Sequence, residues 1–123
     1  MNVRIQGQAT EIPRWITTAL NQLYEVERKL TVQGDPSNAL RNVARIKDAF
    51  EEVHAFYDDP MGQPFNETRT DVEATISGSR TENLVIVEVL KPIVRIGTRE
   101  YSRVIQKGIV IVESTQTAEV SND

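Results

Sequence analysis

Apolar residues in the first part of the chain recur at the spacing of an α-helix. Within residues 13–31 they stand alternately three and four positions apart and form one narrow stripe, at Ile16, Ala19, Leu23, Val26 and Leu30. Pro13 suits the first helical turn, where its missing N–H costs nothing. Gly34 is typical of a helix end, and Asp35 and Pro36 are typical of the start of a second helix.

A second stripe with the same spacing runs up to Asp58-Asp59-Pro60, at Ala39, Val43, Ile46, Phe50, Val53 and Tyr57. The short connection predicts that the two helices are antiparallel neighbours. An isolated hairpin cannot cover both stripes, and other side chains widen the apolar surface, namely Trp15, Leu20, Leu40 and Phe56. We therefore expect a homodimer, a four-helix bundle held by Ile16, Leu23, Val26, Leu30, Val43, Ile46, Phe50 and Val53. The alternative is that the stripes pack on the protein's own β region.

After Pro60 the pattern changes to that of β-strands. Apolar residues alternate or run continuously between Gly, Ser and Pro turn signals, which predicts strands at 71–76, 84–90, 93–96, 101–105 and 108–113. Residues 84–90 place apolar side chains on both faces of the predicted strand, so we expect both faces to be covered. Its one acid, Glu88, then has to reach the rim or a partner, because a buried unpaired carboxylate is costly.

The predicted fold class is α+β, an N-terminal antiparallel helical hairpin followed by a small all-β domain of short strands. We divide the chain into an N-terminal extension (1–12), a helical dimerisation segment (13–60), a partner-binding β domain (61–113) and a disordered tail (114–123). The tail is assigned to disorder because its composition gives it no apolar face to pack.

Composition narrows the class of function. The 123 residues contain 14 Lys and Arg against 18 Asp and Glu, a net charge of −4, which argues against a general nucleic-acid binder. There is no cysteine, so neither a disulfide nor a thiolate metal site can form. No apolar run has the length of a signal-peptide core or of a membrane span, so we expect a soluble, cytoplasmic protein that does not bind membranes.

Positive charge gathers in the predicted β domain. Five cations and only two acids fall within residues 84–112, the cations being Lys91, Arg95, Arg99, Arg103 and Lys107. A stiff apolar ribbon with basic edges predicts a surface that meets an acidic partner.

The residues that catalysis and metal binding usually require are scarce. His54 is the single histidine, and its place beside Val53 favours a structural position on the second helix. The neighbouring acids Glu51-Glu52 and Asp58-Asp59 point apart on a helix and do not form a catalytic pair. The glycines are isolated and make no phosphate loop. We therefore expect a protein that is not an enzyme, with no cofactor and no metal.

The order of these parts resembles the GrpE family, the nucleotide exchange factors of DnaK-type chaperones. A helical segment is followed by Gly62-Gln63-Pro64-Phe65, by the run VIVEVL at 85–90 and, after a hairpin, by RVIQKGIVIV at 103–112. The family pattern reads G-x-P-F-D-P-x-x-H-E-A, then V-V-E-V-L-Q-K-G-Y, then R-V-L-R-P-A-x-V-x-V. The resemblance covers roughly residues 13–113.

The chain departs from the family pattern at several points. Asn66-Glu67 replace D-P, and Lys91-Pro92-Ile93-Val94 replace Q-K-G-Y, so the glycine of that turn is lost. About four extra residues lengthen the hairpin before Arg103, and Gln106-Lys107-Gly108 stand at R-P-A. Only about a dozen residues precede Trp15, so the resemblance is to a short member without the long N-terminal coiled-coil helix.

The resemblance implies a dimeric co-chaperone whose β domain binds the ATPase domain of a DnaK-type chaperone and promotes ADP release. It implies a chaperone-binding role for Arg103, with apolar contacts from Leu90, Val104 and Val112, and a hinge at Gly62, Pro64 and Phe65. The alternative is a GrpE-like dimeric adaptor that has lost exchange activity, which the altered Q-K-G-Y and R-P-A positions favour. A nucleic-acid binder is a third class, which the net charge disfavours.

Overall fold

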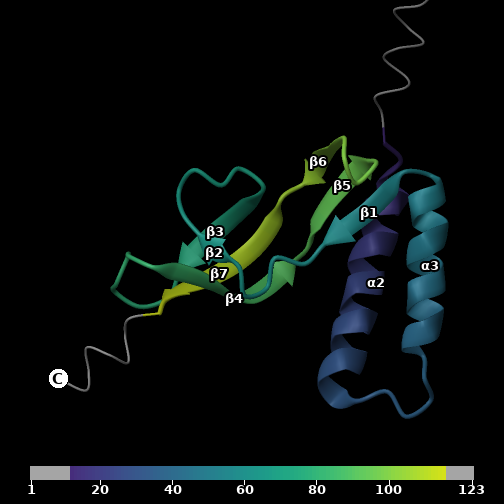
Figure 1. The fold of residues 1–123 in the computed structure, drawn as a ribbon, viewed down its shortest axis with the longest axis horizontal. Coiled ribbons are helices and arrows are strands. Elements are labelled where there is room, and N and C mark those ends of the chain that lie inside the picture. The colour runs from purple at the N-terminus through teal and green to yellow at the C-terminus, as the bar shows by residue number, and fades with distance from the viewer. Residues whose placement is uncertain (1–11, 116–123) are drawn as a thin grey trace, which may run out of the picture.

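A computed structural model describes residues 12–115 and shows an α+β fold in which two helices precede short strands (Figure 1). This order of helices before strands agrees with the sequence-based fold class. Residues 1–11 of the predicted N-terminal extension (1–12) and 116–123 of the predicted tail (114–123) lie outside the described residues. The assignment of Ser114 to a disordered tail is wrong, because Ser114 is buried and ends the last strand. The elements are α2 (Arg14–Gln33), α3 (Leu40–Glu52), β1 (Ala55–Asp58), β2 (Pro64–Phe65), β3 (Val72–Ile76), β4 (Leu84–Lys91), β5 (Ile93–Gly97), β6 (Ser102–Gln106) and β7 (Gly108–Ser114).

The strands form two sheets. β1, β5 and β6 make an antiparallel three-stranded sheet, and the four-stranded sheet has the order β2-β4-β7-β3, in which β3 runs parallel to β7. The five strands expected from the pattern are all present, with ends shifted by at most one residue. The chain passes from one sheet to the other at Pro92, which is fully buried and lacks the N–H that would continue a ladder.

Gly108 begins β7 where the two sheets approach each other. A Cβ atom on Gly108 would lie 3.0 Å from Cγ1 of Ile93 and 3.2 Å from Cγ1 of Val72. A side chain there would push β5 and β3 apart, so the glycine allows the sheets to share one core.

The two helices lie side by side and are joined by residues 34–39 (Figure 1). Gly34 has a φ of 103° and donates its N–H to the carbonyl of Leu30 at 3.0 Å, which closes the last turn of α2. The carboxylate of Asp35 accepts the N–H groups of Ala39 at 2.6 Å and Leu40 at 2.9 Å. Asp35 therefore satisfies two donors that the start of α3 would otherwise leave unpaired.

The second helix is shorter than its apolar stripe predicts. α3 ends at Glu52, and His54 adopts a φ of 64°, a left-handed conformation that stops the helix. The carbonyl of His54 accepts the N–H of Gly97 at 2.8 Å, and residues 55–58 continue as β1 against β5. Phe56 and Tyr57 therefore belong to a strand and not to a helical seam. Their aromatic side chains are also typical of strands, and the pairing with β5 decides the outcome.

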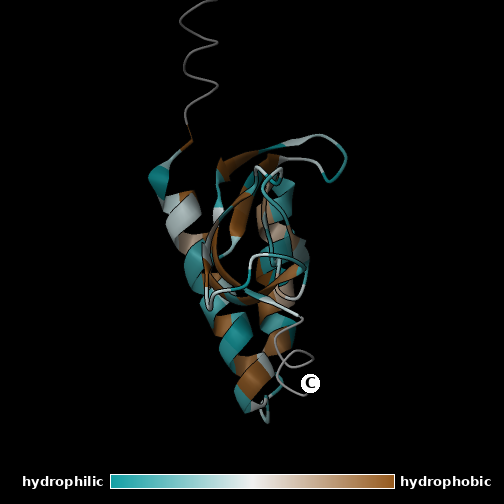
Figure 2. Cartoon of the chain, turned by 90° about the vertical axis from the view of Figure 1, so that its left-hand side faces the viewer, coloured by the Kyte–Doolittle hydropathy of each residue, from teal (hydrophilic) through white to brown (hydrophobic). Residues whose placement is uncertain are grey.

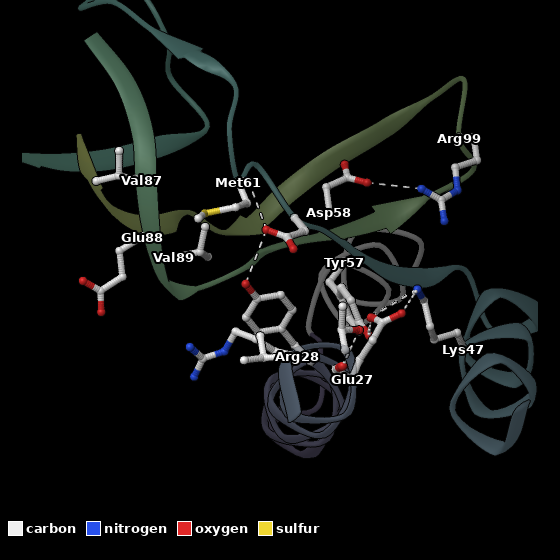
Figure 3. A pocket seen from close by; sticks show the side chains of 14 residues that line it. Glu27, Arg28, Lys47, Tyr57, Asp58, Met61, Val87, Glu88, Val89 and Arg99 are labelled. Carbon is white, nitrogen blue, oxygen red and sulfur yellow. Dashed lines mark hydrogen bonds and ion pairs between the residues drawn. The ribbon is translucent and has the colours of Figure 1, made fainter. Parts of the chain in front are cut away.

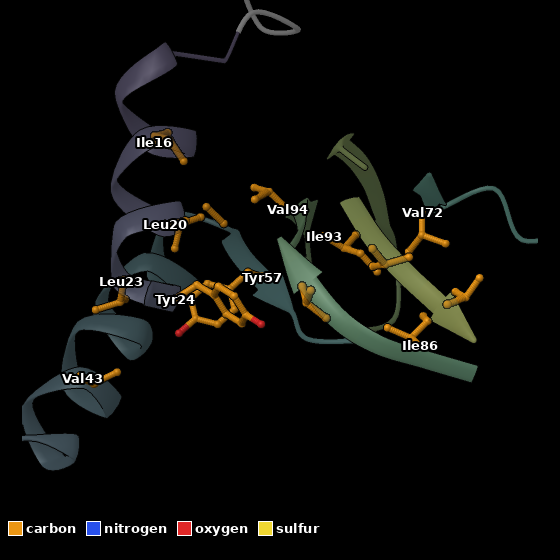
Figure 4. Packing of buried hydrophobic residues seen from close by; sticks show 14 of the residues in the cluster. Ile16, Leu20, Leu23, Tyr24, Val43, Tyr57, Val72, Ile86, Ile93 and Val94 are labelled. Carbon is orange, nitrogen blue, oxygen red and sulfur yellow. The ribbon is translucent and has the colours of Figure 1, made fainter. Parts of the chain in front are cut away.

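One hydrophobic core joins the helices to both sheets (Figure 4). Leu20 and Tyr24 on α2 face β1 and β5, and the core continues through the four-stranded sheet to Val72 on β3. Figure 2 shows hydrophobic residues along both helices as well as in the strands. The helical stripes are thus partly covered by the chain's own β region, which is the alternative that the sequence left open.

The expected dimerisation residues divide into two groups. Ile16, Leu23 and Val43 are buried in the core of the chain itself, which removes them from any free surface. Leu30 and Phe50 are partly buried against that core. The exposed members are Val26, Ile46 and Val53, and Trp15 near the start of α2 is exposed as well.

Candidate partner-binding surfaces

The run VIVEVL forms most of β4, the strand between β2 and β7. Ile86 and Val89 are buried, whereas Val85 and Val87 are half-buried and Leu90 is exposed. The expectation that both faces of this strand are covered is therefore wrong for its second half. The physical reason is irregular pairing, because the register with β7 shifts between Ile86 and Glu88 and again between Val89 and Lys91.

Glu88 itself is exposed, as expected for an acid in so apolar a strand. The register shift next to it turns its side chain out of the core, so no buried partner is required.

The structure brings together only part of the predicted chaperone-binding set. Arg103 is exposed and Val104 half-buried on β6, an edge strand of the three-stranded sheet. Leu90 is exposed on β4, in the other sheet. Val112 is 0% exposed in β7 between β4 and β3, so it is a core residue and cannot contact a partner from there.

Arg95 and Arg99, both expected at the basic edge, are paired with acids of the same chain. Arg95 donates to Asp58 at 2.8 Å and to Asp71 at 3.4 Å. Arg99 donates to Asp58 at 3.2 Å and to Glu51 at 2.7 Å, and its guanidinium lies 4.1 Å from the centre of the Phe56 ring. These contacts tie the hairpin between β5 and β6 to β1 and to the end of α3.

The same network lowers the pKa of one of its acids. Asp71 accepts a bidentate contact from Arg69, at 2.9 Å from Nε and 3.1 Å from Nη2. The hydrogen bond from Arg69 and the charges of Arg69 and Arg95 lower the pKa of Asp71 in spite of partial burial. The basic surface predicted for an acidic partner is therefore weaker than the sequence indicates, although Lys91, Arg99, Arg103 and Lys107 are all exposed.

A second polar cluster, missed at the sequence level, fastens the helices to the three-stranded sheet. Tyr57 on β1 donates its hydroxyl to Glu27 on α2 at 2.5 Å, and Lys47 on α3 donates to the same carboxylate at 3.1 Å. The Lys47 ammonium lies 5.0 Å from the centre of the Tyr57 ring. The partners are 20 and 30 residues apart, so no local sequence pattern could have paired them.

Tyr24 extends this cluster towards the start of β2. Its ring stands edge-on to that of Tyr57, with centroids 5.6 Å apart, and its hydroxyl donates to Asp59 at 3.3 Å. Burial, together with the nearby Asp59 carboxylate, raises the pKa of Tyr24. Burial and the hydrogen bond to Glu27 raise the pKa of Tyr57 in the same way. Both phenols therefore remain donors over the whole neutral range.

The residues predicted to form a hinge are held in the four-stranded sheet. Gly62, with a φ of 81°, donates its N–H to the carbonyl of Ile86 at 2.9 Å. Pro64 and Phe65 form β2 and pair with Val85 and Leu84. These contacts attach the predicted hinge residues to β4. Their role as a hinge stays a prediction.

Comparison with protein-family models, with curated proteins and with solved structures finds no match to this chain. Neither α2 nor α3, the helices of the described part, combines the length and apolar character needed to cross a membrane.

Proposed function

We propose that the protein is a GrpE-like nucleotide exchange factor that binds the ATPase domain of a DnaK-type chaperone and promotes ADP release. The observation that carries this proposal is the succession of family-like motifs in one β region that follows two helices. VIVEVL lies on β4, and RVIQKGIVIV runs through β6 and β7, with Arg103 exposed at the edge of its sheet. The proposed activity and the proposed chaperone partner come from the resemblance of these motifs to the GrpE family.

The proposed activity requires a rigid wedge and no reactive group. A protein that binds the open form of a nucleotide cleft more tightly than the closed form shifts that equilibrium and so releases the nucleotide. Rigidity is supported by the single core and by the Arg95 and Arg99 contacts that fasten the β5–β6 hairpin. Arg103 would supply a charge-assisted hydrogen bond to a chaperone carboxylate, and Leu90 an apolar contact.

We further propose that α2 and α3 act as an antiparallel hairpin that pairs with a second copy in a four-helix bundle. The chain's own core already covers Ile16, Leu23 and Val43, so the interface would use the exposed apolar residues Trp15, Val26, Ile46 and Val53. Apolar side chains exposed on both helices support this pairing, because an interface core is built from such residues.

A dimeric adaptor without exchange activity is the second candidate. The observation that favours it is the internal pairing of Arg95 and Arg99 with Asp58, Asp71 and Glu51. These pairs leave a weaker positive surface for an acidic chaperone lobe than the sequence indicates.

The experiment that separates the two candidates is stopped-flow release of a fluorescent ADP analogue from a DnaK-type chaperone. We expect the wild-type protein to accelerate release. Arg103→Ala should weaken chaperone binding by about 2 kcal/mol, the scale of losing one partner of a buried interfacial charge pair. The free energy of unfolding of the Arg103→Ala variant should differ from that of the wild type by less than about 0.5 kcal/mol, because the side chain is exposed.

Arg41→Ala is the matched control, since it removes an exposed arginine on α3, outside the predicted chaperone-binding set. Equal acceleration by wild type and Arg103→Ala would exclude Arg103 as the contact. Wild-type protein that does not accelerate release at all would leave the adaptor as the better description.

A further inference from the structure

A groove of about 650 Å³ opens between the C-terminal half of α2 and the middle of β4 (Figure 3). Val87, Glu88 and Val89 of β4 lie on one side of it, and Arg28 and Val32 of α2 on the other. Tyr24 and Tyr57 also line the groove, and Met61 lies beside Val89 on the β4 side (Figure 3). The groove is separate from Arg103 and Val104 and has no part in the proposed exchange activity.

The β4 side of this groove is an unpaired strand edge. On that side Ile86 exchanges hydrogen bonds with the segment before β2, donating to Gln63 at 2.9 Å and accepting from Gly62 at 2.9 Å. Residues 60–63, which come just before β2, form a turn in which Gln63 donates to the carbonyl of Pro60 at 3.1 Å. The described residues before this turn do not pair with β4. Within residues 12–115 no strand continues the ladder along this side of β4 from Val87 onwards. Such an edge offers backbone donors and acceptors to another extended chain.

Apolar side chains are exposed around this edge. Val32 on α2 is 78% exposed and Met61 is 53% exposed, although both line the groove. Val87, which lines the groove from β4, is half-buried. Exposed apolar side chains on opposite walls of a groove, next to a free strand edge, match the alternating side chains of an added strand.

The charged side chains that line the groove indicate which charge a bound segment should carry. Glu27 is paired with Lys47, Asp58 with Arg99, and Arg28 with Glu25 outside the lining. Glu88 has no ion pair among the described residues, and Asp59 accepts only from the Tyr24 hydroxyl and the Met61 N–H. The lining thus carries four acids against three cations, so negative charge predominates, and the charge of Glu88 also interacts with that of Arg28 across the groove.

We propose that this groove binds a short extended segment of another protein, apolar at alternate positions and carrying a lysine or arginine, which adds as a strand to the free edge of β4. Main-chain hydrogen bonds to β4 would hold the segment, and its apolar side chains would contact Val32, Met61 and Val87. Its cation would lie near Glu88. The irregular pairing of β4 at Val87 and Leu90 limits the added strand to a few residues.

The test is fluorescence anisotropy with a labelled eight-residue peptide in which valine alternates with lysine and threonine. We expect saturable binding that a peptide with N-methylated valine amides loses, because those amides can no longer donate to the strand edge. A peptide with glutamate in place of lysine should bind at least about tenfold more weakly. Equal binding of the N-methylated peptide, or no binding of the first peptide, would overturn the proposal.

Variants of exposed residues locate the site. Glu88→Lys and Met61→Lys should each weaken binding of the lysine peptide about tenfold or more, and Glu88→Lys should improve binding of the glutamate peptide. Ile76→Lys is the matched control, because Ile76 is an exposed apolar residue on β3 that does not line the groove. If Glu88→Lys or Met61→Lys instead abolishes self-association in sedimentation and leaves peptide binding unchanged, a second copy occupies the groove and the proposal is wrong.

Discussion

His54 determines where the second helix stops. Its φ of 64° lies in the left-handed region, which costs a residue with a side chain roughly 1–2 kcal/mol and glycine nothing. We expect His54→Gly to leave the free energy of unfolding unchanged or raise it by up to about 1 kcal/mol. His54→Val should lower it by about 1–2 kcal/mol, because a β-branched residue tolerates this conformation poorly. Urea denaturation of the two variants and the wild type measures both effects.

The result also distinguishes the strand from the longer helix that the apolar stripe predicts. In an uninterrupted helix through Tyr57, glycine at this position would cost about 1 kcal/mol and valine much less. The opposite order of stabilities, with His54→Gly the least stable variant, would therefore contradict the end of α3 at Glu52.

At the scale of elements, the five predicted strands follow from local patterns, because turn residues and apolar runs mark their ends within the chain. The helix α2 follows from its spacing for the same reason. β1 and β2 could not be predicted, since Phe56 and Tyr57 also fit a helical stripe and β2 has only two residues. Only the pairing of Ala55 with Ile96, 41 positions further on, makes β1 a strand.

The junction between the elements is held by side chains that the sequence does not connect. Tyr57→Phe removes the hydrogen bond from β1 to Glu27 on α2, and we expect a loss of about 0.5–1.5 kcal/mol at pH 8. The pKa of Tyr57 is raised in the folded protein. The protonated hydroxyl therefore contributes its full stabilisation to the free energy of unfolding below about pH 10, the ordinary tyrosine pKa. Above that pH the hydroxyl of Tyr57 loses its proton in the unfolded chain before it does so in the folded protein. The stabilisation by this hydroxyl therefore declines as the pH rises.

The stability gap between wild type and Tyr57→Phe should therefore narrow between pH 8 and pH 11, which urea denaturation at both values measures. Tyr101→Phe is the matched control, because its side chain is 84% exposed at the β5–β6 hairpin. A gap that stays constant or widens with pH would show that the Tyr57 hydroxyl is not held protonated by its surroundings.

At the scale of the whole molecule, the candidate surfaces were the hardest part to predict. The sequence indicates which side chains are basic, but it does not indicate that Asp58 and Asp71 neutralise Arg95. It likewise places Val112 on a strand without revealing that its side chain lies on the face that is buried in the core. The groove beside β4 depends on where the segment after Pro60 first pairs with β4, at Ile86, which no local pattern specifies.

The proposed dimer can be tested with substitutions that spare the chain's own core. Val26→Asp together with Ile46→Asp places charges on exposed positions of both helices. Because these side chains contribute little to the single chain, each change should alter its stability by less than about 0.5 kcal/mol. In the proposed interface the same carboxylates would be buried without partners, at a cost of several kcal/mol each. Sedimentation should report a dimer for the wild type and a folded monomer for the variant.

Leu23→Asp separates this effect from unfolding, because Leu23 lies in the core of the chain and its replacement should lower the melting temperature strongly. Val32→Asp is the control on the helix surface, since Val32 is exposed on α2 outside the apolar stripe. A dimer that survives Val26→Asp with Ile46→Asp would place the interface elsewhere, and a monomeric wild type would leave the exposed apolar residues of α2 and α3 without the proposed role.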